Sequence, residues 1–161
     1  MHGNVGEPAA AWLGQPRTLL VFRLAPSDYH RFHAPVDGVI ESIHTIPGDY
    51  YSVDKFMLDR RPVLQRNVRT VVCIHMLTGA KLVMVIVGAT CVGSIEMRVS
   101  VGQTIHKGDD MGDFKFGGSC VTLVSNTAMA VHEVIQTRSR EHQETYVRVG
   151  EAISTMTSAS P

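Results

Sequence analysis

The apolar residues of this chain fall into short runs rather than at helical spacing. Six runs rich in Val, Ile, Leu and Thr are separated by Gly, Pro and Asp, a pattern typical of strands joined by turns. The predicted strands are Thr18 to Leu24, Val36 to Ile46, Val68 to Met76, Lys81 to Val87, Thr90 to Val99 and Gly112 to Val124. The chain is therefore expected to be mainly β, of the α+β class, with antiparallel strands and a few short helices.

Only two stretches favour a helix. Ser27 or Asp28 is suited to cap a short helix over Tyr29 to Phe32. Apolar residues at helical spacing predict a second helix from Thr127 to Arg138. The first 16 residues, with their Gly and Pro, are expected to be irregular, and the chain from Ser154 onward is expected to be a loose tail.

The length of 161 residues fits a single domain, 1–161, large enough to form a core without metal or disulfide staples. Hydrophobic residues make up 44% of the chain, which argues against intrinsic disorder. The 15 basic residues balance the 15 acidic ones. A net charge of zero gives no electrostatic basis for binding nucleic acid, so no such partner is expected.

The cysteines and the apolar runs bear on the compartment. Cys73, Cys91 and Cys120 include no C-x-x-C pair and cannot all pair with one another, so a reducing, intracellular compartment is expected. The apolar, uncharged stretch Leu82 to Ile95 has 14 residues, whereas a membrane-spanning helix needs about 20. No transmembrane segment is therefore expected, and contact with a membrane surface stays open.

Two segments of the sequence are similar. A strand from Ala34 leads to Pro47-Gly48-Asp49, and another from Val101 leads to Lys107-Gly108-Asp109. This pairing of a strand with a Gly-Asp turn resembles the half-motifs of a barrel-sandwich, the fold of biotinyl and lipoyl carriers, so barrel-sandwich-like halves are expected. A carrier needs a lysine at a hairpin tip. Lys55 is the one candidate, and we interpret it as an ordinary solvated side chain.

Two groups of residues have the composition of a reactive site. Gly117-Gly118-Ser119 is interpreted either as a tight turn or as a site where the Ser119 hydroxyl attacks the preceding carbonyl carbon. His30 and His33 would share one face of a helix, and imidazoles suit acid–base catalysis near neutral pH. The alternative is two hydrogen-bonded structural histidines. No clear third ligand accompanies the pair, so no metal site is expected.

Three blocks together resemble one family. They are Arg23-Leu-Ala-Pro-Ser-Asp-Tyr-His-Arg-Phe-His-Ala-Pro-Val-Asp-Gly, Val87-Gly-Ala-Thr-Cys-Val-Gly-Ser-Ile and Lys107-Gly-Asp-Asp-Met-Gly-Asp-Phe-Lys-Phe-Gly-Gly-Ser. In this order and spacing they resemble the signature of the phosphatidylserine decarboxylases. The resemblance implies a proenzyme that cleaves itself between Gly118 and Ser119 into a β chain, 1–118, and an α chain, 119–161.

The resemblance also implies the cofactor and the reaction. Ser119 would become a covalent pyruvoyl group, which forms a Schiff base with the substrate amine and accepts the electrons released on decarboxylation. His33 matches the family histidine that activates the serine, and His30 matches a second histidine that binds substrate or handles the proton. The substrate would be phosphatidylserine in a membrane surface, and the products phosphatidylethanolamine and CO2. Peripheral membrane association and a homodimer are further expectations.

The chain departs from the family's pattern on its N-terminal side. Family members carry an upstream aspartate that orients the histidine, as in a protease triad, whereas no Asp precedes Arg23 here. Asp28 and Asp37 flank the histidines and are the candidates for that role. Two alternatives stay open: a pyruvoyl-dependent decarboxylase of a free amino acid such as tryptophan, and an N-terminally short fragment of the family that does not mature.

Overall fold

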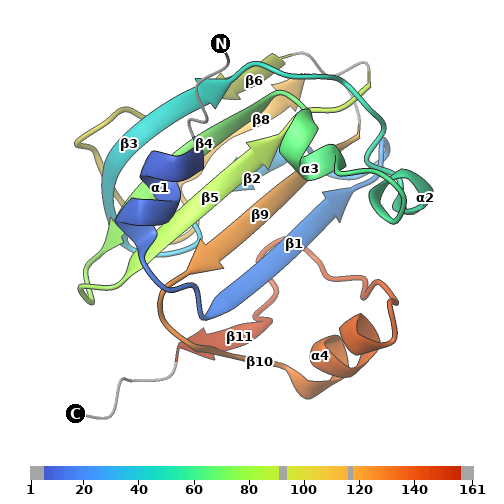
Figure 1. Cartoon of the computed structure of the whole chain (residues 1–161). Coiled ribbons are helices and arrows are strands. Elements are labelled where there is room, and N and C mark those ends of the chain that lie inside the picture. The colour runs from blue at the N-terminus through green and yellow to red at the C-terminus, as the bar shows by residue number, and fades with distance from the viewer. Residues whose placement is uncertain (1–5, 91–93, 116–117, 157–161) are drawn as a thin grey trace.

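A computed structural model describes residues 6–90, 94–115 and 118–156 of the chain, which form mainly antiparallel strands. Figure 1 shows the larger sheet, whose six strands lie in the order β1-β9-β5-β4-β3-β7. Their bounds are β1 (Thr18–Leu24), β3 (Gly38–Ile46), β4 (Arg69–Met76), β5 (Lys81–Val87), β7 (Thr104–Ile105) and β9 (Ser119–Ser125). The predicted strand-rich, antiparallel fold is confirmed.

A smaller sheet packs on one face of the larger one. Its strands pair in the order β2-β8-β6, with the bounds β2 (Arg31–His33), β8 (Asp110–Lys115) and β6 (Ser94–Met97). One buried cluster joins the two sheets and includes Phe32 and Phe114 of the smaller sheet and Ile40 and Ile74 of the larger one. The two phenyl rings meet edge to face, with centroids 5.3 Å apart. Burial of this apolar surface is the main favourable contribution to the fold.

Four helices and a two-stranded ribbon complete the described part of the chain. Their bounds are α1 (Gly6–Leu13), α2 (Lys55–Leu58), α3 (Val63–Arg66), α4 (Glu133–Arg140), β10 (Met129–Val131) and β11 (Ser154–Met156). Figure 1 shows α1 lying across the outer face of the larger sheet. There Ala9 and Leu13 pack with Val71, Cys73 and Val83. The first 16 residues were expected to be irregular, and this helix makes that expectation wrong.

The helix predicted over Tyr29 to Phe32 is also wrong. The Asp28 carboxylate accepts the Ala25 N–H at 2.7 Å, and the Asp28 N–H donates to the Ala25 carbonyl at 2.9 Å, which forms a turn instead of a helix cap. The chain then extends into β2, where Phe32 is buried in the core. Burial of Phe32 outweighs the weak preference of so short a segment for helix. His30 and His33 therefore do not share a helix face.

The C-terminal part is more ordered than the sequence predicted. The helix expected from Thr127 to Arg138 is divided into strand β10 and helix α4, because β10 pairs with β11. The tail expected to be loose from Ser154 onward begins with that strand. Pairing with a distant segment cannot be read from local pattern, so neither strand was predicted.

The predicted strand from Gly112 to Val124 is two strands in different sheets, β8 and β9. Gly118, between them, has φ +87°, a conformation that interrupts a strand and favours glycine. The strand predicted from Thr90 to Val99 narrows to β6, and Cys91 lies outside the described residues.

The two similar segments of the sequence lie side by side. Gly38 of β3 is paired with Ile105 of β7. The Ala34 N–H donates to the Asp109 carbonyl at 2.8 Å, and the Gly108 N–H donates to the Ala34 carbonyl at 2.8 Å. The repeated units thus hold each other in register, and they position the Gly108 carbonyl beside the histidine segment.

Candidate active site

Ser119 lies at the start of β9, the strand between β1 and β5. Its register partner in β1 is Leu24, and the next residue, Cys120, is paired with Val87 of β5. Ser119 is fully buried, and its Oγ has no hydrogen-bond partner among the described residues. A buried hydroxyl without a partner is energetically costly, and a chemical role is one reason for a structure to keep such a group.

The residue before it has the conformation of a turn. Gly118 has φ +87°, and a Cβ built there would have no atom within 4 Å. The space around Gly118 would admit a side chain, but its backbone conformation disfavours one. Gly117, the other glycine singled out from the sequence, lies outside the described residues.

His33 is held by groups on both of its ring nitrogens. Nδ1 lies 3.0 Å from the Gly108 carbonyl oxygen, and Nε2 lies 2.9 Å from the Tyr29 hydroxyl. The Tyr29 and His33 rings stack at 5.7 Å between centroids with an interplanar angle of 9°. Since a carbonyl oxygen can only accept, Nδ1 carries the proton, and Nε2 is the basic nitrogen that accepts from the phenol.

The two candidate orienting acids have other partners. Asp28 accepts the Ala25 N–H in the turn described above. The Asp37 carboxylate accepts the Lys107 N–H at 2.8 Å and lies 3.7 Å from His106 Nδ1. In this structure a backbone carbonyl, rather than either carboxylate, fixes the tautomer of His33.

His30 lies closer than His33 along the sheet register to the chain segment that leads to Ser119. The His30 carbonyl accepts the Phe114 N–H at 2.9 Å, whereas His33 is paired with Asp110 at the other end of β8. His30 Nε2 lies 3.1 Å from the Pro26 carbonyl oxygen, and its Nδ1 is buried without a partner among the described residues. His30 Nδ1 and Ser119 Oγ are therefore two unsatisfied polar atoms of the candidate site.

An ion pair beside the site was not predicted from the sequence. Arg23, paired with Cys120 in the sheet register, donates to both carboxylate oxygens of Glu144, at 2.6 and 2.7 Å. This contact raises the pKa of Arg23 and lowers the pKa of Glu144. Arg23 belongs to the first resemblance block, but no motif marks Glu144. Burial raises the pKa of Cys120 to about 12, so its thiol is neutral.

Near Cys120, the side-chain amide of one buried asparagine hydrogen-bonds two separate chain segments. Asn67, fully buried, accepts the Tyr51 N–H and donates to the carbonyls of Tyr51 and Gly88. The Thr90 hydroxyl donates to the Tyr50 carbonyl at 2.8 Å. These bonds join the loop before α2 to the Val87-Gly-Ala-Thr block.

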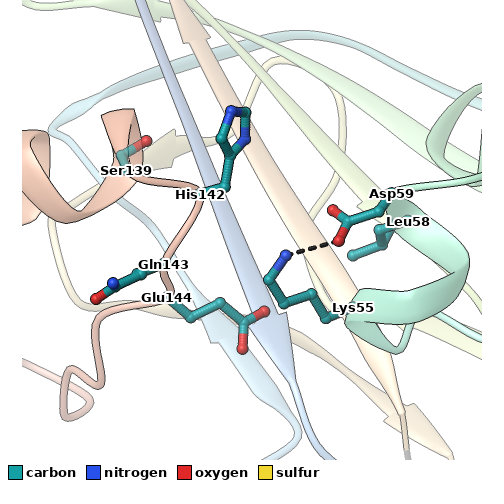
Figure 2. Close-up of a pocket in the computed structure, with 7 residues that line it drawn as sticks. All are labelled: Lys55, Leu58, Asp59, Ser139, His142, Gln143 and Glu144. Atoms are coloured by element: carbon teal, nitrogen blue, oxygen red, sulfur yellow. Dashed lines mark hydrogen bonds and ion pairs between the residues drawn. The ribbon is translucent and has the colours of Figure 1, made fainter.

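A cavity of about 180 Å³ lies between α2 and the segment after α4. Figure 2 shows Lys55, Leu58 and Asp59 on one side and Ser139, His142, Gln143 and Glu144 on the other. Lys55 is the first residue of α2 and pairs with Asp59 at 2.6 Å. It is not at the tip of a hairpin, which removes the main support for a carrier.

Within 6–90, 94–115 and 118–156, no group of three or more His, Cys, Asp or Glu is arranged to hold a metal ion. In the same part of the chain, no helix is long and apolar enough to cross a bilayer.

The structure is thus a β-rich domain in which a buried serine follows a glycine of positive φ at the start of a central strand. The family described as phosphatidylserine decarboxylase matches residues 5–155. The chain therefore belongs to the phosphatidylserine decarboxylase family.

Relatives from plants and bacteria agree. Phosphatidylserine decarboxylase proenzyme 2 of Oryza sativa is 41% identical over 136 residues, 83% of this chain and 22% of the relative. The proenzyme of Clostridium kluyveri is 37% identical over 84% of this chain and 47% of its own length. The proenzyme of Clostridium novyi is 41% identical over 86% of this chain and 48% of its own length. The chain spans about half the length of these bacterial relatives.

Proposed function

We propose that this chain carries the catalytic core of a phosphatidylserine decarboxylase, which converts phosphatidylserine to phosphatidylethanolamine and CO2. The observation that carries the proposal is Ser119, whose buried hydroxyl has no partner in the described part of the chain and which directly follows a glycine of positive φ. Family membership supports it, and several relatives are named as proenzymes of this activity.

Maturation would begin at the Gly118–Ser119 bond. Ser119 Oγ attacks the Gly118 carbonyl carbon while His33 accepts the hydroxyl proton. The amide C–N bond breaks, the amine is protonated, and an ester links the two residues. Loss of the Ser119 Cα proton and of the Gly118 carboxylate from Cβ leaves an enamine, which hydrolyses to a pyruvoyl group with release of ammonia. The products are a β chain, 1–118, and an α chain, 119–161.

His33 has to change partners for this role. In the structure its basic Nε2 accepts from Tyr29, and Ser119 Oγ has no partner among the described residues. The Gly108 carbonyl already holds the proton on Nδ1, which keeps Nε2 available as a base. The candidate acids Asp28 and Asp37 are not needed to fix this tautomer.

A pyruvoyl group would be formed from Ser119 itself, whose Cα would become the keto carbon and whose Cβ would become the methyl group, at a fully buried position. Once formed, it would supply the electron sink that decarboxylation of an α-amino acid requires. His30, with its buried and partnerless Nδ1, is the residue we assign to positioning substrate or holding the proton that replaces the carboxylate.

The two products would stay together. Strand β9 of the α chain lies between β1 and β5 of the β chain, and the Arg23–Glu144 ion pair also crosses from one to the other. The substrate lies in a bilayer, so the domain would act at a membrane surface. A homodimer remains a prediction.

The test is the intact mass of the purified chain under denaturing conditions, beside Ser119→Ala and the matched exposed serine variant Ser100→Ala. We expect two pieces, split between Gly118 and Ser119, for the wild type and Ser100→Ala, and one full-length mass for Ser119→Ala. The smaller piece should resist N-terminal sequencing. CO2 release from phosphatidylserine vesicles, but not from free tryptophan, should follow. An uncut wild-type chain would refute maturation, and release from tryptophan alone would replace the lipid by a free amino acid.

A further inference from the structure

Helix α2 and the loops on either side of it present aromatic and cationic side chains to solvent. Tyr50 is 51% exposed and Phe56 is 62% exposed. Arg60 and Arg61, directly after the helix, are exposed as well. We call these four residues the α2 tip.

The fold fixes this orientation. Met57 and Leu58, on the other side of the helix, pack against the buried cluster that contains Val53 and Cys120. The Asp54 carboxylate caps the helix by accepting the Met57 N–H at 2.9 Å. The helix therefore cannot turn to bury Phe56 without giving up both contacts, and the phenyl ring is held outward.

The charges of the tip are left unpaired. Lys55 and Arg66, the neighbouring cations, form ion pairs with Asp59 and Asp49. Arg60 instead lies over the Phe56 ring, 3.8 Å from its centroid. Arg60 also donates to the Phe56 carbonyl at 3.3 Å and helps to lower the pKa of Asp59, and among the described residues neither Arg60 nor Arg61 forms an ion pair within 4.0 Å. Residues 49–69 hold five basic and three acidic side chains, although the whole chain is balanced.

The tip lies at the reactive end of the larger sheet. At this end of the sheet β9 begins with Ser119, and Val87 of β5 is paired with Cys120. At the opposite end of the strands, Leu82 is paired with Ser125, the last residue of β9. Figure 1 shows α2 projecting beyond the sheet at the end where β1 finishes and β9 begins.

We propose that the α2 tip docks on an anionic lipid bilayer, with Phe56 and Tyr50 entering the interface and Arg60 and Arg61 contacting lipid phosphates. Exposed aromatic rings beside cations are suited to the boundary between headgroups and acyl chains, and each basic residue near an anionic surface adds about 1 kcal/mol. Docking of this tip directs the Gly118–Ser119 end of the domain toward the membrane. The inference deepens the proposed function, because it names the surface that meets the substrate's bilayer.

The test measures binding of the full chain to phosphatidylcholine vesicles with and without phosphatidylglycerol, an anionic lipid that is not the proposed substrate. All proteins carry Ser119→Ala, so that each is a single uncut chain. We expect binding to the anionic vesicles that weakens at high salt. The double variant Arg60→Ser/Arg61→Ser should weaken it about fivefold for each arginine removed, and Phe56→Ser should weaken it at least fivefold.

Two matched controls lie at the opposite end of the sheet. Leu77, 67% exposed in the turn between β4 and β5, is a large apolar side chain, and Arg17, exposed before β1, is an arginine. Leu77→Ser and Arg17→Ser should bind as the parent does. Equal losses in these controls, no binding by the parent, or full binding by the tip variants would each overturn the proposal. The proposal would also be overturned if light scattering shows a dimer that Phe56→Ser abolishes, because the exposed ring would then belong to a dimer interface.

A gain of signal guards against misfolded variants. Phe56→Trp adds a second indole to a chain whose one natural tryptophan, Trp12, belongs to α1 and packs against the larger sheet. Brominated anionic lipid should quench the added fluorescence and leave that of the Trp12-only parent unchanged; equal quenching would contradict docking at the tip. The vesicle-binding proteins all carry Ser119→Ala, so their binding does not depend on maturation. Vesicle binding by these proteins together with an uncut wild-type chain would refute the proposed function alone. Cleavage of the wild type without vesicle binding would refute this inference alone.

Discussion

Replacement of Asn67 should lower the free energy of unfolding of this domain strongly, although the side chain is small. It is fully buried, and its amide makes three hydrogen bonds: from the Tyr51 N–H at 3.0 Å, and to the Tyr51 and Gly88 carbonyls at 2.8 Å each. Asn67→Leu keeps the volume nearly constant and removes all three. The perturbation therefore tests hydrogen bonding rather than packing.

The magnitude follows from the groups left behind. A typical hydrogen bond contributes about 1 kcal/mol net, and a buried polar group left without a partner costs about 1–3 kcal/mol. One N–H and two carbonyls lose their partner, while the leucine recovers about 1–2 kcal/mol through apolar burial. We expect a net loss of about 3 kcal/mol, a large fraction of the free energy of unfolding of a domain this size.

The assay is urea unfolding followed by circular dichroism, with every variant built on Ser119→Ala so that cleavage does not confound the comparison. Gln65→Leu is the matched control, since Gln65 is exposed on α3, the short helix that ends just before Asn67, and should change stability by less than about 0.5 kcal/mol. If Asn67→Leu lowers the free energy of unfolding by less than about 1 kcal/mol, with an unchanged slope of that free energy against urea concentration, the reasoning is refuted. The hydrogen bonds of this amide would then not stabilise the loop before α2 against Gly88.

Three further predictions concern single interactions. Arg23 lowers the pKa of Glu144, so the pair stabilises the fold above the unfolded pKa of about 4.3 and the gain is lost as pH falls through the lower folded pKa. Glu144→Gln should therefore cost less than about 1 kcal/mol at pH 7, since both groups are partly exposed, and nothing near pH 2; an equal cost at both pH values would contradict the pairing. Gly112→Ala would place a Cβ in overlap with the Glu96 carbonyl oxygen and 2.6 Å from the Phe32 ring, and should cost roughly 2–3 kcal/mol in urea unfolding, whereas a loss under 1 kcal/mol would show that β8 can shift. Cys120, with a pKa of about 12, should be alkylated by iodoacetamide at pH 8 only after denaturation, as mass analysis of peptides would show; labelling of the folded chain would place the thiol in reach of solvent.

The sequence predicted strands where an apolar run was both long and bounded by turn residues. β4 and β5 match the expected runs within a residue, because their side chains are buried on both faces, under α1 and against the smaller sheet. The sequence did not predict strands whose pairing partners are distant along the chain. β2 and β11 are three residues long, and each exists because another strand lies beside it.

The site was predictable only as far as motifs reach. Ser119 and the histidines lie in blocks that resemble a family, so they could be named without a structure. The Gly108 carbonyl that holds His33 could not, because a backbone acceptor leaves no trace in residue type. Glu144 was missed for a related reason: its partner Arg23 is 121 positions away, and nothing local marks the acid.

The position of Ser119 explains how a chain could be cut at its active site without falling apart. A strand at the edge of a sheet is held by one neighbour, but β9 is held along its length by two, with Thr122 paired to Val21 of β1 and Val85 of β5. Cleavage before Ser119 would free one end of β9 and leave both ladders intact. Because Gly118 lies outside those ladders, its turn could open and give the new terminus room while the sheet keeps its register. The same arrangement that buries Ser119 would thus preserve the fold after the proposed cleavage.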